Sequence, residues 1–328
     1  EHRADMLARL SRVHMRLGQP EQAVARADQA LAIAEPGRYR RIVAEAFVNR
    51  AASLGALKRI EEPIILMQAA VEMAHELGDV TLELRARNNL AAVQGTENGD
   101  SAMRVAREAY DLATRMGIGQ MATWISGGLA WGSTYEGLDW DASLRMLDTE
   151  IESSLADGDR GRLIAVRELI VSWRGEDDPQ LTAQRRRLLK SVSDPDLELW
   201  DKLSPAQLAL VRGRYGEATR LFGEASRIPG QNTTDARYGY VLSSQLARDL
   251  DAARAAREAM ADEPYAGSYI DAMRTLAEAG VAALESRTVA ALGAYRETLA
   301  IYARTGVRFQ AALVQLTALM ALPDERSI

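Results

Sequence analysis

Residues 213–225 read Gly-Arg-Tyr-Gly-Glu-Ala-Thr-Arg-Leu-Phe-Gly-Glu-Ala, and this stretch decides the fold. A glycine turn is followed by Ala218, Phe222 and Ala225, which are spaced by four and three residues. Residues with that spacing share one face of an α-helix. A small side chain such as alanine on that face lets another helix approach closely. The stretch therefore predicts the second helix of a tightly packed helical pair.

The same layout recurs along the chain at a nearly constant interval. Small or apolar residues follow a turn in three further places: Ala23, Ala27 and Ala30; Ala102, Ala106 and Ala109; Ala142 and Met146. Weaker copies centre on Pro63, Ala253 and Ala291, and one more is needed near Gln180 to keep the rhythm. From residue 23 to residue 291, successive anchors are 40, 39, 40, 76, 35 and 38 residues apart. This period is typical of stacked helical pairs, because one pair cannot bury its own apolar face.

The turns between these copies predict where helices begin and end. We expect helical pairs at residues 3–34, 39–77, 80–116, 119–156, 160–191, 195–227, 234–262 and 267–304, and a last helix at 307–321. Asp178-Pro179 and Ser204-Pro205 resemble helix starts, with a capping side chain before a proline at the first helical position. Alternatively, Pro205 kinks one longer helix at about 195–212. The sequence thus predicts a single all-α domain over residues 1–328, a right-handed α-α superhelix of about eight helix pairs plus a terminal helix.

Composition limits the classes of function. Of the 328 residues, 47% are apolar and 26% are charged, and the absence of cysteine excludes disulfides and thiolate metal sites. No apolar run approaches the roughly 20 residues that cross a bilayer. The net charge of −6 and the pI of about 5.4 disfavour direct binding to nucleic acid. We expect a cytoplasmic protein without membrane contact, and the start at Glu1 without a methionine predicts a fragment of a longer protein.

Several segments resemble a known repeat family. The run at 213–225 resembles the second half of a tetratricopeptide repeat. Residues 76–79, 87–91 and 300–306 resemble the longer variant found in the C-terminal part of large bacterial signal-transduction ATPases, including MalT-like and LuxR-type regulators and cyclase–ATPase fusions. The resemblance covers essentially the whole chain. It departs from the pattern at Pro63, where alanine is expected, and over 174–200, which puts the register of the repeats there in doubt.

Residues that usually carry catalysis or bind metals are not grouped. His2, His14 and His75 lie far apart in the sequence and have no carboxylate at ligand spacing. Residues 117–122 match a dinucleotide-binding fingerprint on paper, but that fingerprint requires a strand leading into the turn, and here a helix is expected. We therefore predict no catalytic residue, no metal site and no cofactor.

The densest basic run is Arg185-Arg186-Arg187 with Lys190. Consecutive residues of a helix point in different directions, so this run does not make one flat patch. We expect a solvated helix face. Contact with an acidic partner, another domain or nucleic acid is the alternative.

An aromatic stripe is the best candidate for a binding site. Trp124, Gly128, Trp131 and Tyr135 share one face of a predicted first helix, and Gly127 adjoins them. First helices line the concave surface of such an array, so the aromatic rings could anchor a ligand while the glycines allow close approach. Alternatively, both tryptophans fill space beside small residues of neighbouring helices.

The resemblance implies further ligand contacts. Groove contacts in tetratricopeptide domains come from polar residues of the first helices, and the matching residues here are Asn49, Arg87, Asn88 and Arg167. We expect a non-catalytic interaction or sensor scaffold that binds a protein, a peptide or a small effector on its concave face. A stand-alone adaptor that recognises peptides is the alternative. The expected partners are a protein or peptide, or adjoining domains of the parent protein, and homodimer formation is possible.

Overall fold

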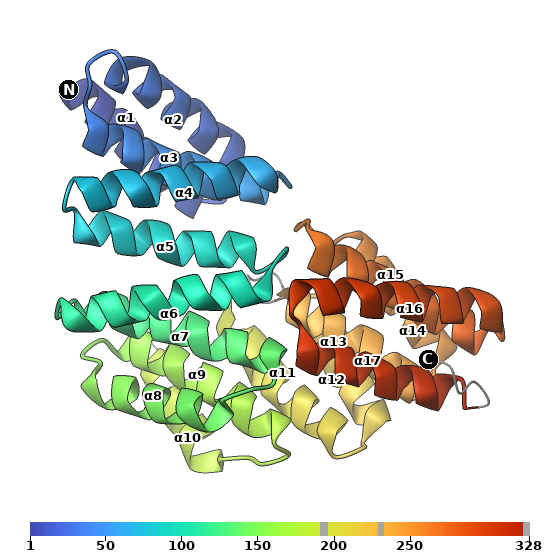
Figure 1. The fold of residues 1–328 in the computed structure, drawn as a ribbon. Helices are drawn as coiled ribbons and strands as arrows, with labels where there is room; N and C mark the ends of the chain where they lie inside the picture. The colour runs from blue at the N-terminus through green and yellow to red at the C-terminus, as the bar shows by residue number, and fades with distance from the viewer. Residues whose placement is uncertain (191–195, 229–232, 324–328) are drawn as a thin grey trace. The chain divides into compact units, whose positions relative to one another are not determined.

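The computed structural model describes residues 1–190, 196–228 and 233–323, and it is all-α (Figure 1). This part of the chain contains 17 helices and no strand. The helices are α1 (His2–Arg16), α2 (Pro20–Ala34), α3 (Arg40–Ala56), α4 (Glu61–Glu76), α5 (Val80–Gln94), α6 (Gly99–Arg115), α7 (Gly119–Glu136), α8 (Trp140–Ser153), α9 (Asp157–Trp173), α10 (Pro179–Leu189), α11 (Asp196–Val211), α12 (Tyr215–Ala225), α13 (Thr233–Leu246), α14 (Leu250–Ala261), α15 (Ser268–Leu284), α16 (Thr288–Thr305) and α17 (Arg308–Ala321).

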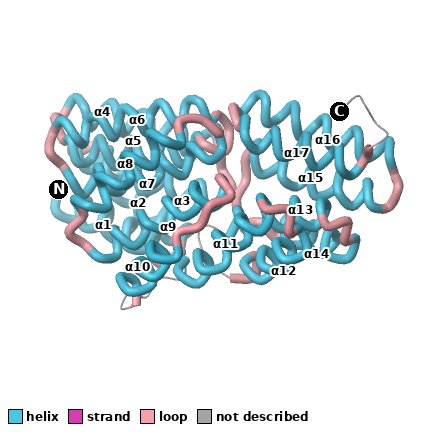
Figure 2. Tube along the Cα trace, turned by 90° about the horizontal axis from the view of Figure 1, so that it is seen from below, coloured by secondary structure: helices cyan, strands magenta, loops and turns pink. Residues whose placement is uncertain are grey.

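The helices follow one another as eight pairs and a terminal helix, as the sequence predicts. Every end lies within three residues of its predicted position. Short loops join them (Figure 2). Several loops turn at a glycine with a left-handed backbone, such as Gly18 (φ +68°) and Gly213 (φ +72°), because a side chain is strained in that conformation. Neighbours along the chain pack together, so the fold is an all-α helical repeat.

The repeat register is visible at the fourth residue of most second helices. That residue is small and fully buried in α2 (Ala23), α12 (Ala218) and α16 (Ala291). In α8 the prediction that Ala142 and Met146 occupy the buried positions is wrong. Ala142 is exposed, and Ser143 is the fourth helical residue and is buried. α8 starts three residues after Gly137, whereas α2 and α12 start two residues after Gly18 and Gly213, and Asp139 takes the left-handed conformation before it (φ +56°).

The two proline signals have different outcomes. Asp178 caps α10 by accepting a hydrogen bond from the Leu181 amide, and Pro179 is the first helical residue, as predicted. Ser204-Pro205, by contrast, does not start a helix. Pro205 lies inside α11, so the alternative of one longer helix is correct. The poorly matching stretch of the sequence also includes residues 191–195, which lie outside the described residues.

The chain forms two compact units. Unit 1 comprises Glu1–Ile125 and Pro264–Ser268, and unit 2 comprises Ser126–Glu263 and Tyr269–Ile328. In unit 1 the first helices also contact one another, α1 with α3 and α3 with α5. Asn49 joins α3 to α1, because its Nδ2 donates to the Ala8 carbonyl at 2.9 Å. The loop segment at 264–268 is held by Glu97, whose carboxylate accepts hydrogen bonds from the backbone amide and hydroxyl of Ser268, each at 2.7 Å.

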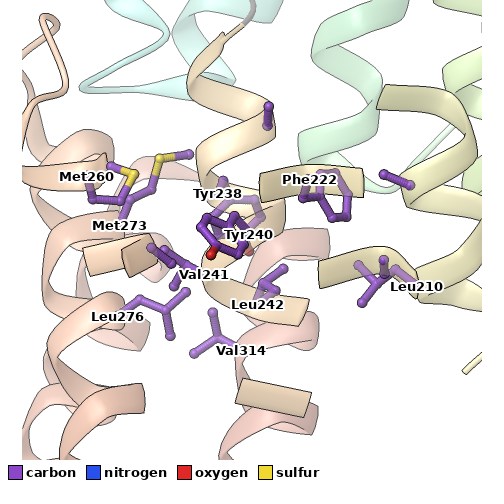
Figure 3. Packing of buried hydrophobic residues seen from close by; sticks show 14 of the residues in the cluster. Leu210, Phe222, Tyr238, Tyr240, Val241, Leu242, Met260, Met273, Leu276 and Val314 are labelled. Carbon is purple, nitrogen blue, oxygen red and sulfur yellow. The ribbon is translucent and has the colours of Figure 1, made fainter. Parts of the chain in front are cut away.

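Unit 2 has a larger core that contains most of the buried aromatic side chains. Figure 3 shows part of it, where Phe222 of α12 lies beside Tyr238 and Tyr240 of α13, and Met260 of α14 lies beside Met273 of α15. Successive pairs contribute side chains to one continuous cluster. This is the expected way for helical pairs to bury their apolar faces.

The terminal helix α17 packs on helices distant in sequence. Its Phe309 ring contacts the rings of Trp140 and Trp173 edge-on, with both centroid distances at 5.2 Å. Near its other end, the Met320 carbonyl accepts a hydrogen bond from Arg248 at 3.3 Å. The last helix predicted at 307–321 is therefore packed on one face, where Val314 and Ala318 are fully buried, whereas Leu316 and Leu319 are about half exposed.

Two glycines make a direct test of this packing. A Cβ at Gly239 in α13 would overlap the ring of Phe222, which is 1% exposed and cannot move aside. Gly239→Ala should therefore destabilise unit 2 by about 1–3 kcal/mol. Gly293→Ala in α16 is the control, because a Cβ there meets open space and alanine favours the helix by roughly 0.5–1 kcal/mol. Chemical denaturation of both variants checks this, and equal effects would contradict the close approach.

Candidate functional site

The most unusual site in the chain is a group of aromatic rings around one carboxylate in unit 2. We call it the aromatic–acid cluster. Its members come from five helices: Trp131 and Tyr135 of α7, Trp200 of α11, Asp235 and Tyr238 of α13, Tyr269 of α15, and Tyr302 of α16. Four of these helices are first helices of their pairs. Because α7, α11, α13 and α15 belong to different pairs, stacking of the pairs is what brings these residues together.

A chain of hydrogen bonds links the cluster's polar atoms. The indole Nε1 of Trp131 donates to the Tyr135 hydroxyl at 2.9 Å. The Tyr135 hydroxyl in turn donates to Asp235 Oδ1 at 2.7 Å. Trp131, Tyr135 and Asp235 are all half-buried, so this chain reaches the accessible edge of the cluster.

The aromatic rings pack mainly edge to face. Trp131 and Trp200 have centroids 5.1 Å apart at an interplanar angle of 81°, and Tyr135 and Tyr269 have centroids 5.5 Å apart at 85°. Tyr269 then contacts Tyr302 at 5.6 Å. Edge-to-face pairs are favoured by the ring quadrupole and add about 0.5–1.5 kcal/mol each beyond burial. The rings are therefore held in defined orientations around the carboxylate.

The carboxylate of Asp235 is half-buried, and none of the described cationic side chains pairs with it. Burial raises the pKa of Asp235 to about 7, the Tyr135 hydrogen bond acts in the opposite direction, and the nearby charge of Glu263 adds to the rise. Arg237, the nearest basic side chain on α13, pairs with Glu263 at 2.9 Å instead. Burial also holds the pKa values of the Tyr135, Tyr238 and Tyr269 hydroxyls well above their usual range.

Asp235 should make unit 2 less stable as the pH rises. The carboxyl has a pKa near 3.8 when unfolded and about 7 when folded. Between these values the folded state holds a proton that the unfolded state releases, so the free energy of unfolding falls from about pH 4 to about pH 7 and is constant above. A difference of about 3 between the folded and unfolded pKa lowers the free energy of unfolding by at most roughly 4 kcal/mol. Exposure of the half-buried carboxylate to solvent makes the loss smaller.

Melting temperatures of the intact chain measured from pH 4.5 to 8 test this. Asp235→Asn should flatten the profile and raise the melting temperature at pH 8. Asp251→Asn is the control, because the Asp251 side chain is 99% exposed. A profile that is the same in the wild type and Asp235→Asn would contradict the assignment.

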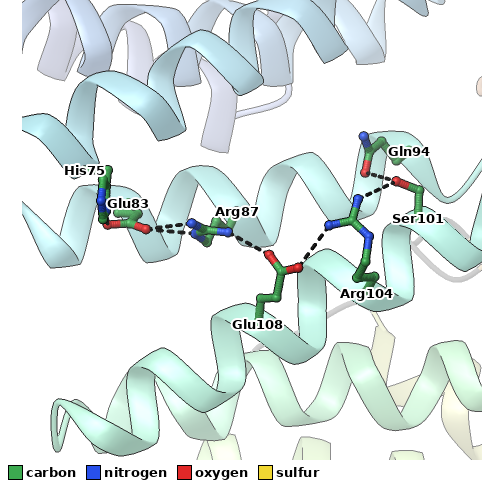
Figure 4. Close-up of polar contacts among 7 residues, drawn as sticks. All are labelled: His75, Glu83, Arg87, Gln94, Ser101, Arg104 and Glu108. Carbon is green, nitrogen blue, oxygen red and sulfur yellow. Dashed lines mark hydrogen bonds and ion pairs between the residues drawn. The ribbon is translucent and has the colours of Figure 1, made fainter.

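Unit 1 carries a second polar array, which includes the predicted residue Arg87. Figure 4 shows the array running along α5 and α6. Arg87 pairs with Glu83 at 2.8 Å and with Glu108 at 3.1 Å, and Glu108 also pairs with Arg104 at 2.9 Å. Its charges are largely matched within the array. The arrangement therefore joins α5 to α6 and leaves Arg87 about one-fifth exposed.

A less balanced charged set lies on the first helices of unit 1. Arg85 of α5 pairs with Glu45 of α3 at 2.9 Å, and Arg12 of α1 lies close to both. Burial and repulsion from Arg85 lower the pKa of Arg12. The Nε of Arg85 is buried without a hydrogen-bond partner. Arg12 thus lies in the combined field of Arg85, Arg16 and Glu45, in which positive charge predominates.

The structure separates the seven site residues predicted from the sequence. Trp131 and Tyr135 meet in the aromatic–acid cluster, whereas Trp124, on the same helix, is 54% exposed and belongs to unit 1. Asn49 is buried and holds α1, as described above. Asn88 is half-buried on α5, beside Arg87. Arg167 of α9 pairs with Asp148 of α8 at 2.7 Å.

The structure also decides two further sequence expectations, one for a basic run and one for a glycine motif. Of the basic run at 185–187, the expectation of a solvated face is wrong for Arg185, which is 3% exposed and pairs with Glu168 and Asp201. Arg186, Arg187 and Lys190 are exposed as expected. The turn around Gly117 and Gly119 lies between α6 and α7, so a helix leads into it and the strand that a dinucleotide site requires is not there.

Most members of the aromatic–acid cluster were missed by sequence reasoning. Asp235, Tyr238, Tyr269 and Tyr302 lie about 100 to 170 residues after Tyr135, and no local motif joins them. The available signal was positional: Asp235, Tyr238 and Tyr269 lie in predicted first helices, as do Trp131 and Tyr135. Aligning the first helices of the weak later copies would have been needed to use it.

Comparisons with known proteins assign no family. No protein-family model matches the chain, and no curated protein matches it. Within the described ranges, no group of three or more histidine, aspartate or glutamate side chains is placed to hold a metal ion. None of the described helices is both long and apolar enough to cross a membrane.

Proposed function

We propose that this chain is a non-catalytic binding scaffold that holds a small effector or a segment of a partner at the aromatic–acid cluster. The observation that supports it most is that the half-buried Trp131 and Tyr135 of α7 and Asp235 of α13 are joined by hydrogen bonds, although they come from two different first helices. Oriented aromatic rings with a few polar atoms are typical of recognition sites. A signalling role follows from the same proposal, as the sensor or scaffold arm of a larger bacterial regulator of the tetratricopeptide type.

The site is suited to transmitting occupancy. Its residues come from helices in several pairs, so a ligand that moves one ring displaces the faces by which these pairs pack. Helical arrays respond to such changes through small rotations between neighbouring repeats. A bound effector would in this way change the curvature of unit 2.

The experiment is a thermal-shift screen of the purified chain against a library of metabolites and short peptides. We expect at least one compound to raise the melting temperature of the wild type and to lose this effect in Trp131→Ala. Trp124→Ala is the matched control, because Trp124 lies on the same helix but is 54% exposed and outside unit 2. Far-ultraviolet circular dichroism should show nearly unchanged helicity for both variants. A ligand whose shift persists in Trp131→Ala would place the binding site elsewhere.

A second candidate function is a stand-alone adaptor for acidic peptides, and the charged set of unit 1 favours it. Glu45 pairs with Arg85, Arg12 lies close to both, and the Arg85 Nε has no hydrogen-bond partner. A peptide carboxylate would supply the missing acceptor. If the wild type binds an acidic peptide, Arg12→Met loses this binding and Trp131→Ala keeps it, the result would support this function over the first.

A further inference from the structure

We propose that the ligand group recognised at the aromatic–acid cluster is an organic ammonium ion, held between the Asp235 carboxylate and the surrounding aromatic rings. This inference rests on the proposed function and names the chemical class of its ligand. Three features of the site carry it: an acid with no cationic partner, aromatic faces and edges around that acid, and a buried hydroxyl with no partner.

The acid is the first feature. Asp235 Oδ1 accepts the Tyr135 hydroxyl, and no other described side chain pairs with this carboxylate. The charged groups near it do not neutralise it. Glu263, packed beside it, has the same sign and is 1% exposed, and it is itself satisfied by Arg237 and by the Thr234 hydroxyl at 2.9 Å. Arg274 of α15 donates to backbone carbonyls of Met260 and Glu263. A desolvated carboxylate is costly unless a cation pairs with it, so the site favours a positive ligand.

The rings are the second feature. Trp131 and Tyr135 are half-buried, as Asp235 is, and their rings pack edge-on against those of Trp200 and Tyr269. Aromatic faces attract ammonium groups through their quadrupole, and the attraction grows when water is excluded. An acid combined with several rings therefore selects a cation with an organic body over a hydrated metal ion.

The third feature selects for hydrogen-bond donors. Tyr269 is 7% exposed, and its hydroxyl is buried with no hydrogen-bond partner. That hydroxyl lies close to those of Tyr135, Tyr238 and Tyr302 and to Asp235. An N–H group that enters the cluster would donate to this oxygen and to the carboxylate. We therefore expect a primary ammonium group to bind more tightly than a quaternary one.

The test uses n-butylammonium as the probe, with 1-butanol as the uncharged analogue and butyrate as the anionic one. Binding to the intact chain is followed by tryptophan fluorescence and by titration calorimetry. We expect n-butylammonium to bind at least tenfold more tightly than 1-butanol or butyrate at pH 8. Below about pH 7 its affinity should fall by about tenfold per pH unit, because the cation then competes with a proton for Asp235.

Variants separate this inference from the proposed function. Asp235→Asn should weaken n-butylammonium at least tenfold and remove the pH dependence, while Asp251→Asn should leave both unchanged. Equal affinities for n-butylammonium and 1-butanol, or an unchanged affinity in Asp235→Asn, would overturn the inference. If a neutral or anionic compound from the library binds and loses its effect in Trp131→Ala, the proposed function stands and the ammonium assignment is wrong. If no compound binds at all, both the proposed function and the ammonium assignment are wrong.

Discussion

Ala218→Arg should abolish the cooperative unfolding of unit 2. Ala218 is the fourth residue of α12 and is fully buried in the large core, where α12 meets the neighbouring helices. An arginine there has no room, and its charge would have no partner. We expect a loss of about 4 kcal/mol or more, which exceeds the effect of most single substitutions.

Thermal unfolding followed by circular dichroism measures this loss. Gly216→Arg supplies the control, because it places the same side chain on the same helix at an exposed position where a Cβ meets open space. That variant should change stability by less than about 1 kcal/mol. An unchanged melting temperature in Ala218→Arg would mean that α12 does not contact its neighbours through this face.

The second large effect is expected at Arg185. Its guanidinium is 3% exposed and pairs with Glu168 of α9, which is 6% exposed, at 2.6 Å. It also pairs with Asp201 of α11 at 2.7 Å. Arg185→Met leaves Glu168 buried without its cation, which should cost about 3–5 kcal/mol. Asp201 adds little to this cost, because it is more exposed and keeps Arg186.

A double variant distinguishes the lost pairing from lost packing. In Arg185→Met with Glu168→Leu, both charges are absent, and most of the lost stability should return. Arg186→Met removes an exposed arginine next to it and should cost less than about 0.5 kcal/mol. If the double variant is as unstable as Arg185→Met alone, the shape of the arginine rather than its charge holds α9, α10 and α11 together.

Helix positions were predictable because local signals decide them. Glycine turns, capping residues and alanines at helical spacing all act within one helix or one pair. This is why the start of even the weakly matching α10 was found from Asp178-Pro179. The buried residue of a helix was predicted wrongly where a local spacing pattern fits two neighbouring residues. Ala142 fits the spacing rule, yet α8 starts one residue later after its glycine than α2 and α12 do, so Ser143 is the buried residue.

Features that depend on contacts between distant segments were beyond such reasoning. The sequence offered Trp131 and Tyr135 as either ligand anchors or packing residues. The structure shows Trp131 packed on Trp200 and the Tyr135 hydroxyl bonded to the half-buried Asp235. Arg185 is similar, since its neighbours in the chain are exposed and nothing local shows that two carboxylates from other helices reach it. Periodicity identifies which face of a helix is buried, but not which polar partner it meets there.

The return of α17 onto the earlier helices determines how unit 2 comes apart. In a simple array the last helix frays first, because it has one neighbour. Here Phe309 is inserted between Trp140 and Trp173, and Arg248 holds the Met320 carbonyl, so detaching α17 breaks contacts with helices α8, α9 and α13 as well as with α16. Unit 1 has no such closure at α1, which packs on α2 and α3 and exposes Met6, Leu10 and Val13. Amide hydrogen exchange should therefore be fastest at α1, and the protection of α17 should approach that of the unit 2 core.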